Sequence, residues 1–255
     1  MSDLLRISCL EEGIYRLQMD DPAAQNRLGH ELAAQLCTAL ADLAQEPALR
    51  VLLLAGRADV FSAGGSLEVL EQLASRQMEE RELFALPDRL LHFPMPVIAV
   101  LEGHAVGGGL VLALCCDLLV AASECRYGFN FTELGFTPGM GATTLLPLLV
   151  PSTLAAEMLL TARLFRGSEL AARGLFNAVV PAAAVPDAAL DLARRIALKP
   201  RHVLELLKET LALPRRQALQ EAMVREQWMQ RLCFNHPDTH RHIQENYLPA
   251  SPPAQ

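Results

Sequence analysis

Gly103-His-Ala-Val-Gly-Gly-Gly109 and the earlier stretch Phe61-Ser-Ala-Gly-Gly65 decide the fold of this chain. Short apolar runs at residues 51–54 and 96–101 precede them, and such runs are typical of strands buried on both faces. A helical pattern follows each stretch, so strand, glycine turn and helix occur twice. Glycine lets backbone amides at such a turn face a cleft, because no Cβ atom stands in the way. The following helix N-terminus adds partial positive charge. The two turns could form an oxyanion hole, although a tight turn alone explains either stretch equally well.

The pattern continues on both sides of these turns. Alternating apolar residues predict a strand over residues 14–19, and leucines at helical spacing predict a helix over residues 30–45. Gly135-Phe-Thr-Pro-Gly-Met-Gly141 predicts a third turn, which feeds a helix at residues 142–149. The sequence therefore predicts an α/β fold.

Helical patterns dominate the rest of the chain as far as residue 247. Pro186 and Asp187 are suited to the first turn of one helix, and residues 215–232 form the pattern of another. Residues 248–255 are rich in Pro and Ala, and we expect them to be a disordered tail.

Composition narrows the class of protein. The chain has 255 residues, 51% hydrophobic and 20% charged, which is typical of one compact globular domain. Its net charge of −7, with basic residues spread along the chain, argues against nucleic acid as a partner. No secretory signal or membrane span is visible, so we expect a cytoplasmic protein. The six cysteines form no CxxC pair, and we expect them to be reduced and structural.

The three glycine motifs, in this order and spacing, resemble those of the enoyl-CoA hydratase/isomerase (crotonase) superfamily over residues 5–245. The resemblance implies a ClpP-like spiral of ββα turns over residues 1–195 and a helical trimerisation region over residues 196–247. It also implies that the oxyanion amides belong to Gly65 and Gly108. Negative charge that develops on a thioester oxygen would be stabilised by these donors.

Members of this family are similar in their partners and cofactors. The resemblance implies an acyl-thioester substrate carried on phosphopantetheine, either of coenzyme A or of an acyl carrier protein. It implies no metal and no redox cofactor, and assembly as a homotrimer or a dimer of trimers.

Hydration is not the reaction that the sequence favours. Hydratases of the family resemble one another in carrying two glutamates, and the matching positions here hold Val111 and Phe131. Neither side chain can transfer a proton. Glu133 lies two residues from the second position and is a weaker candidate for a catalytic base.

A narrower resemblance points to another reaction. Residues 127–143, which begin Tyr127-Gly-Phe-Asn130, and Cys233-Phe-Asn-His-Pro-Asp238 are similar to the decarboxylating crotonases of polyketide β-branching cassettes. The resemblance implies loss of CO2 from a 3-methylglutaconyl group on an acyl carrier protein. Val111, Phe131, Tyr127 and Asn130 are the expected pocket residues, and an apolar wall would favour CO2 loss from a substrate carboxylate.

The chain departs from that group at two positions. Those decarboxylases resemble one another in using a lysine after the first motif and a histidine before the Cys-Phe motif. Here the helix from Ser66 has no lysine, and Gln230 stands at the histidine position. Arg76, His236 and Gln230 are therefore weaker candidates for the proton donor or for a partner of the substrate carboxylate. His104, within the second motif, is more simply explained by a structural role.

Three functions follow as hypotheses. The first is the decarboxylation, and the second is double-bond isomerisation of an enoyl thioester with Glu133 as the base. The third is a partner protein that keeps the fold and binds thioesters without turnover.

Overall fold

The chain winds through repeated units of two strands and a helix. The computed structural model describes residues 4–247, so the expected disordered tail lies outside the described residues. The units consist of β3, β4 and α2 (Val51–Ala55, Val60–Ser62, Leu67–Ala74), then β5, β6 and α4 (Val97–Leu101, His104–Val106, Gly108–Leu114), then β7, β8 and α5 (Leu118–Ala122, Arg126–Gly128, Ala142–Leu149). The α/β class and the spiral of ββα turns are thereby confirmed.

Each unit contributes one strand to each of two sheets. The larger sheet has the order β1-β2-β3-β5-β7-β10, and the smaller has the order β4-β6-β8-β9. Pairing is parallel except between β1 and β2 and between β8 and β9. The additional strands are β1 (Leu5–Glu11), β2 (Ile14–Met19), β9 (Phe165–Arg166) and β10 (Ala178–Val180).

Strand β3 shows why the large sheet is buried on both faces. All five of its residues are buried. Val51 and Leu53 pack in the cluster that contains α8 (Val185–Ala197), whereas Leu52 and Leu54 pack in the main core. Alternate side chains of a strand point to opposite faces, so a continuous apolar run is required here.

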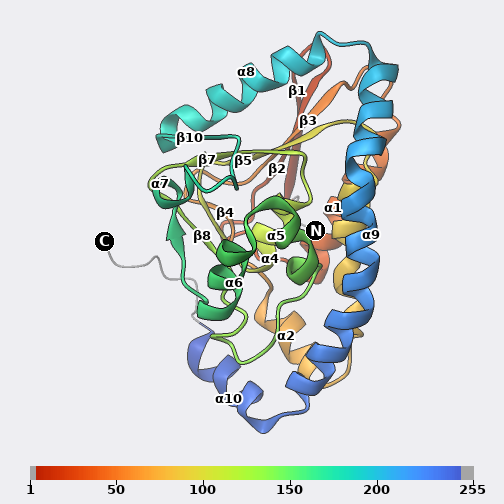
Figure 1. The fold of residues 1–255 in the computed structure, drawn as a ribbon. Helices are drawn as coiled ribbons and strands as arrows, with labels where there is room; N and C mark the ends of the chain where they lie inside the picture. The colour runs from red at the N-terminus through yellow and green to blue at the C-terminus, as the bar shows by residue number, and fades with distance from the viewer. Residues whose placement is uncertain (1–3, 248–255) are drawn as a thin grey trace.

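Helices surround the sheets (Figure 1). Helix α8 crosses one end of the molecule, and the long helix α9 (Arg201–Phe234) runs along one side to α10 (Pro237–Asn246) at the other end. The remaining helices are α1 (His30–Ala44), η1 (Glu80–Phe84), α3 (Ala85–Leu91), α6 (Ser152–Thr161), α7 (Gly167–Leu170) and η2 (Ala182–Ala184).

Helix α9 is longer than the sequence pattern indicated. A helix was expected over residues 215–232, but α9 has 34 residues and contains Pro214. Lys208 and Arg215, on either side of Pro214, both bind Asp117, at 2.6 and 2.5 Å. Attachment of both halves to one carboxylate offsets the helix-breaking tendency of proline.

Two further observations concern the length of the apolar helices and the state of the cysteines. No helix within residues 4–247 is long and apolar enough to cross a membrane. All six cysteines are free, and Cys115 and Cys116 are buried, where desolvation raises the pKa of the Cys115 thiol to about 12.

Candidate active site

The first glycine turn follows β4 and is held between neighbouring backbones. Gly64 has φ +97°, a conformation that glycine adopts without strain. Leu28 N–H donates to Gly64 O at 2.7 Å, and Ser66 N–H donates to Leu28 O at 3.3 Å. The Ser66 side chain then caps α2 by accepting from Val69 N–H. Gly65 is therefore fixed between β4 and the start of α2.

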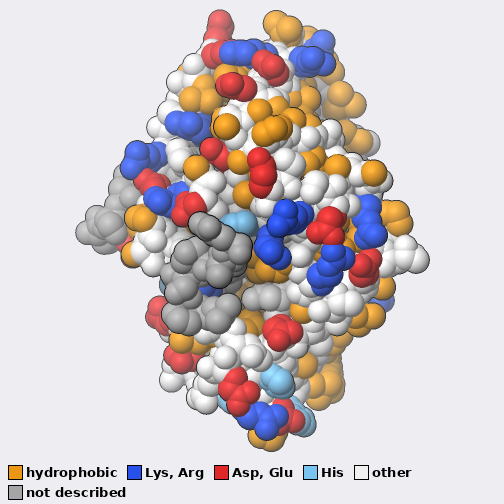
Figure 2. Space-filling view, turned by 90° about the vertical axis from the view of Figure 1, so that its left-hand side faces the viewer, with side chains coloured by type: hydrophobic (Ala, Val, Ile, Leu, Met, Phe, Trp, Pro, Cys, Tyr) orange, Lys and Arg blue, Asp and Glu red, His pale blue; other side chains and the backbone are white. Residues whose placement is uncertain are grey.

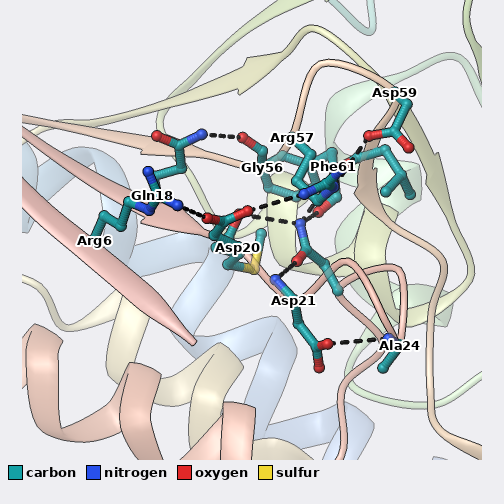
Figure 3. Close-up of polar contacts among 12 residues, drawn as sticks. Arg6, Gln18, Asp20, Asp21, Ala24, Gly56, Arg57, Asp59 and Phe61 are labelled. Carbon is teal, nitrogen blue, oxygen red and sulfur yellow. Dashed lines mark hydrogen bonds and ion pairs between the residues drawn. The ribbon is translucent and has the colours of Figure 1, made fainter. Parts of the chain in front are cut away.

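A buried asparagine supports this turn through side-chain hydrogen bonds. Asn26 is fully buried, with φ +51°, and its Nδ2 donates to Phe61 O at 3.0 Å and to Met19 O at 3.2 Å. Its Oδ1 accepts from Asp21 N–H at 2.7 Å. In the same loop the Asp21 carboxylate accepts from Ala24 N–H (Figure 3). Asn26 was not among the residues predicted from the sequence, although asparagine tolerates a left-handed turn after Asp-Pro.

The second glycine turn packs directly against the first. Gly107 has φ +55° and caps α4, and Gly108 begins that helix. A Cβ on Gly109 would collide with the Ser62 carbonyl, and a Cβ on Gly64 would lie 3.0 Å from Val106 O. These glycines allow two strand-to-helix turns to approach more closely than side chains would permit.

The two predicted oxyanion residues meet at one cavity. Both Gly65 and Gly108 line a cavity of about 230 Å³. The Gly65 nitrogen lies 3.8 Å from the point that a Cβ on Gly108 would occupy, and the Met140 Sδ lies 2.9 Å from the same point. The turns therefore bring these two backbones together at one cavity.

The cavity wall is mainly apolar. Apart from glycines, its apolar and small members are Leu28, Ala33, Ala34, Cys37, Ala63, Val69, Leu70, Leu73, Met78, Leu83, Ala85, Leu86, Phe131, Leu134, Phe136 and Met140. Its longer polar members are Arg27, His30, Glu82, Asn130, Gln230 and Tyr247. Of the predicted pocket residues, Phe131 and Asn130 therefore lie in the wall, together with Gln230.

Aromatic packing fixes the position of Phe131. Its ring stacks on Phe129 at 6.2 Å between centroids and meets Phe136 edge-on at 5.8 Å. Next to it, the Asn130 Oδ1 lies 2.7 Å from the point that a Cβ on Gly107 would occupy. One face of the cavity is thus a fixed phenyl ring beside an amide.

Gln230 is an unusual member of the wall because it is buried but incompletely paired. It is 1% exposed, and its Nε2 makes one long hydrogen bond of 3.5 Å to Thr137 O. Its Oε1 has no hydrogen-bond partner among the described residues. The amide packs so closely on Gly139 that a Cβ there would collide with it. A buried amide oxygen without a partner costs free energy that a bound molecule could recover.

A buried carboxylate holds the third turn. Glu226 lies on α9 and accepts from Gly141 N–H at 2.7 Å and from Thr143 N–H at 2.8 Å. Burial raises the pKa of Glu226 to about 7, against the lowering effect of these donors. The bonds fix the turn in which Met140 adopts φ +62° and faces Gly108.

Two predicted pocket residues do not lie in the cavity wall. Tyr127 is fully buried, and its hydroxyl donates to Leu101 O at 2.9 Å and accepts from Ala122 N–H at 2.9 Å. Val111 is also fully buried, in the part of α4 that belongs to the main core. Neither Tyr127 nor Val111, which were expected to line the pocket, is among the residues that line the cavity.

Several predicted polar candidates also lie outside the wall. Arg76 is exposed and bonds Asn235 Oδ1, and His236 is exposed and caps α10 by accepting from Asp238 N–H. Glu133 is exposed. His104 accepts from Arg126 N–H at 2.8 Å through Nδ1, and burial lowers its pKa. Of the weaker candidates, Gln230 alone lines the cavity.

The structure adds residues that the sequence did not indicate. His30 and Glu82 are exposed members of the wall, and His30 Nε2 is hydrogen-bonded to Gln72 Oε1. Tyr247 reaches the cavity from the end of α10. Within residues 4–247, no cluster of three or more His, Cys, Asp or Glu side chains is arranged to hold a metal ion.

The chain is also similar in sequence to known proteins. The family model for enoyl-CoA hydratase/isomerase matches residues 10–248. The chain is 35% identical over 240 residues to the bacillaene synthase decarboxylase PksI of Bacillus subtilis, with 93% of this chain and 95% of the relative covered. It is 32% identical over 246 residues to the 2,3-dehydroadipyl-CoA hydratase of Escherichia coli, with 95% and 94% covered.

Solved structures are also similar to this chain over nearly its whole length. One belongs to a dehydratase/decarboxylase enzyme couple involved in polyketide β-branching, with a TM-score of 0.92, 33% identity and coverage of 96% of this chain and 99% of that one. Another is the decarboxylase domain of CurF from Lyngbya majuscula, with a TM-score of 0.87, 30% identity and coverage of 95% and 98%.

Proposed function

The chain belongs to the enoyl-CoA hydratase/isomerase family, and from this premise we propose that it decarboxylates a 3-methylglutaconyl-type acyl thioester in polyketide β-branching. The main support for the proposal is that Gly65 and Gly108 meet at one mainly apolar cavity. The relatives named as decarboxylases, similar over nearly the whole chain, support it.

The backbone amides of Gly65 and Gly108 would hold the thioester oxygen. As the carbon–carbon bond to the carboxylate breaks, its electron pair moves into the conjugated system and the thioester becomes a dienolate. Preorganised donors at an oxyanion are each worth about 3 to 4 kcal/mol of barrier lowering. A proton from solvent then replaces the lost CO2.

The character of the wall favours this reaction over hydration. Phe131 lies in the wall, at a position where the resemblance to hydratases would call for a glutamate, and the carboxylate of Glu226 is bound to the third turn. An apolar wall disfavours the charged carboxylate and suits neutral CO2. The isomerase alternative loses support because Glu133, its expected base, is exposed and lies outside the wall.

We propose an acyl carrier protein as the bearer of the substrate, a cytoplasmic location and a homotrimeric or larger assembly. On the face shown in Figure 2, outside the grey residues, basic and acidic side chains are interspersed rather than gathered into one basic area.

Helix α9 exposes a series of large apolar side chains, which supports packing against another copy: Leu206, Leu207, Leu211, Val224, Trp228 and Leu232.

The test is mass spectrometry of a carrier protein that bears the glutaconyl group, incubated with the purified protein. We expect the carrier arm to lose the mass of CO2, and in D2O to gain one deuterium. Deuterium uptake without loss of mass would show isomerisation instead. Binding of the carrier without any change in mass would contradict both reactions and favour a non-catalytic partner.

A further inference from the structure

Tyr247 makes a direct contact with the first glycine turn from the far end of the chain. Its hydroxyl donates a 3.0 Å hydrogen bond to Gly65 O, across 182 residues of sequence. The hydroxyl therefore links the residue that follows α10 to Gly65, in the first glycine turn.

The ring of Tyr247 is itself held in place. The Arg27 guanidinium lies over it, 4.7 Å from the centroid, and Arg27 lies next to Leu28, which pairs with the same turn. A cation over a tyrosine face stabilises that arrangement. The phenol is thus oriented before any ligand binds.

Helix α10 reaches the third glycine motif as well. Thr239 Oγ1 donates to Gly135 O at 2.8 Å, and Asn246 Nδ2 donates to Glu133 O at 3.0 Å. The orientation of Tyr247 is therefore fixed by contacts on two sides of the cavity. Tyr247 follows directly on this anchored helix.

We propose that Tyr247 is a positioning residue that fixes the Gly65 amide in its orientation toward Gly108. The inference rests on the proposed role of Gly65 as an oxyanion donor. A glycine turn has wide backbone freedom, and an oxyanion donor is effective only when its direction is fixed beforehand. A hydrogen bond to the carbonyl of the same residue removes part of that freedom.

Tyr247→Phe deletes the hydroxyl and keeps the ring under Arg27. We expect kcat for CO2 release to fall about tenfold, the effect of about 1.4 kcal/mol on the barrier, while KM and the unfolding temperature stay close to those of the unsubstituted protein. The matched control is Tyr15→Phe, because Tyr15 lies on β2 and outside the cavity wall. Loss of stability with kcat unchanged would overturn the proposal and leave a structural role.

A second measurement needs no substrate. Hydrogen–deuterium exchange of peptides that cover residues 61–70 should be faster in Tyr247→Phe and unchanged in Tyr15→Phe. If the unsubstituted protein releases no CO2, the proposed reaction fails while this measurement still tests the positioning role. Equal exchange in all three proteins would show that Tyr247 does not fix the turn, whatever the reaction is.

Discussion

The Thr143 hydroxyl donates a 2.6 Å hydrogen bond to Oε1 of Glu226, although 83 residues separate them in the chain. Glu226 is fully buried on α9, and its carboxylate takes the place of a side-chain cap at the start of α5. The helix that runs along the side of the molecule thereby holds the turn in which Met140 faces Gly108.

Glu226→Gln should change how stability depends on pH. Burial raises the pKa of Glu226 from 4.5 to about 7, so between these values the folded protein holds a proton that the unfolded chain has released. The contribution of this group to the free energy of unfolding is therefore greatest below pH 4.5 and falls by about 3 kcal/mol as the pH rises past 7. Glutamine does not titrate. Urea denaturation should show the unsubstituted protein losing about this much stability relative to the variant between pH 4 and pH 8. A difference that is constant with pH would contradict the assignment.

Gly108→Ala should remove activity while the fold is retained. The added methyl group would lie 2.9 Å from Met140 Sδ and 3.4 Å from Leu28 Cδ1, which are ends of flexible side chains that can shift. It would also enter the space beside the Gly65 nitrogen, where the thioester oxygen is expected. We expect kcat to fall by about 10²- to 10³-fold, as on loss of an oxyanion donor. Steady-state kinetics and circular dichroism together check this, and near-normal turnover would be evidence against an oxyanion site here.

Asn26→Ala should be strongly destabilising. It leaves the carbonyls of Met19 and Phe61 and the Asp21 N–H without their buried partner, and alanine is disfavoured at φ +51°. We expect a loss of about 2 to 4 kcal/mol in the free energy of unfolding. Asn26→Asp should be no better, because a carboxylate cannot donate to those carbonyls. Denaturant titration that finds either variant as stable as the unsubstituted protein would contradict this.

Replacing different members of the charge cluster formed by Asp117, Lys208 and Arg215 should lower the free energy of unfolding by different amounts. Asp117→Ala leaves Lys208 and Arg215, both buried, without their shared carboxylate, and should cost about 3 to 5 kcal/mol. Lys208→Met leaves Asp117 paired with Arg215 and bonded to Val97 N–H, so we expect a loss below about 2 kcal/mol. Equal losses in denaturant titrations would show that the charges do not act as one cluster.

Gln230→Met should separate stability from activity. Methionine has a similar shape and removes the buried Oε1 that has no partner among the described residues, so the free energy of unfolding should stay within about 1 kcal/mol or rise. If the buried amide binds the acyl group, turnover should fall about tenfold when that amide is removed. Thermal unfolding and CO2 release measured on the same preparation check both parts. Unchanged turnover would assign Gln230 to packing on Gly139 alone.

Local patterns predicted much of the fold. The apolar runs that became β3 and β5 and the leucine spacing of α1 were readable because burial on both faces or on one stripe is a property of a short segment. The glycine turns were readable because few other residues adopt positive φ or allow such close backbone approach. Motif order then indicated the family.

Tertiary structure decided which side chains serve the cavity. Tyr127 and Val111 lie in or next to the motifs in sequence, yet neither lines the cavity. Both are buried in the core, where the Tyr127 hydroxyl is bonded to the Leu101 and Ala122 backbones. Glu226 and Tyr247 carry no local signal, since their partners are 83 to 85 and 182 residues away. A sequence pattern reports the needs of one segment, whereas a site assembled from distant segments exists only after the chain has brought them together.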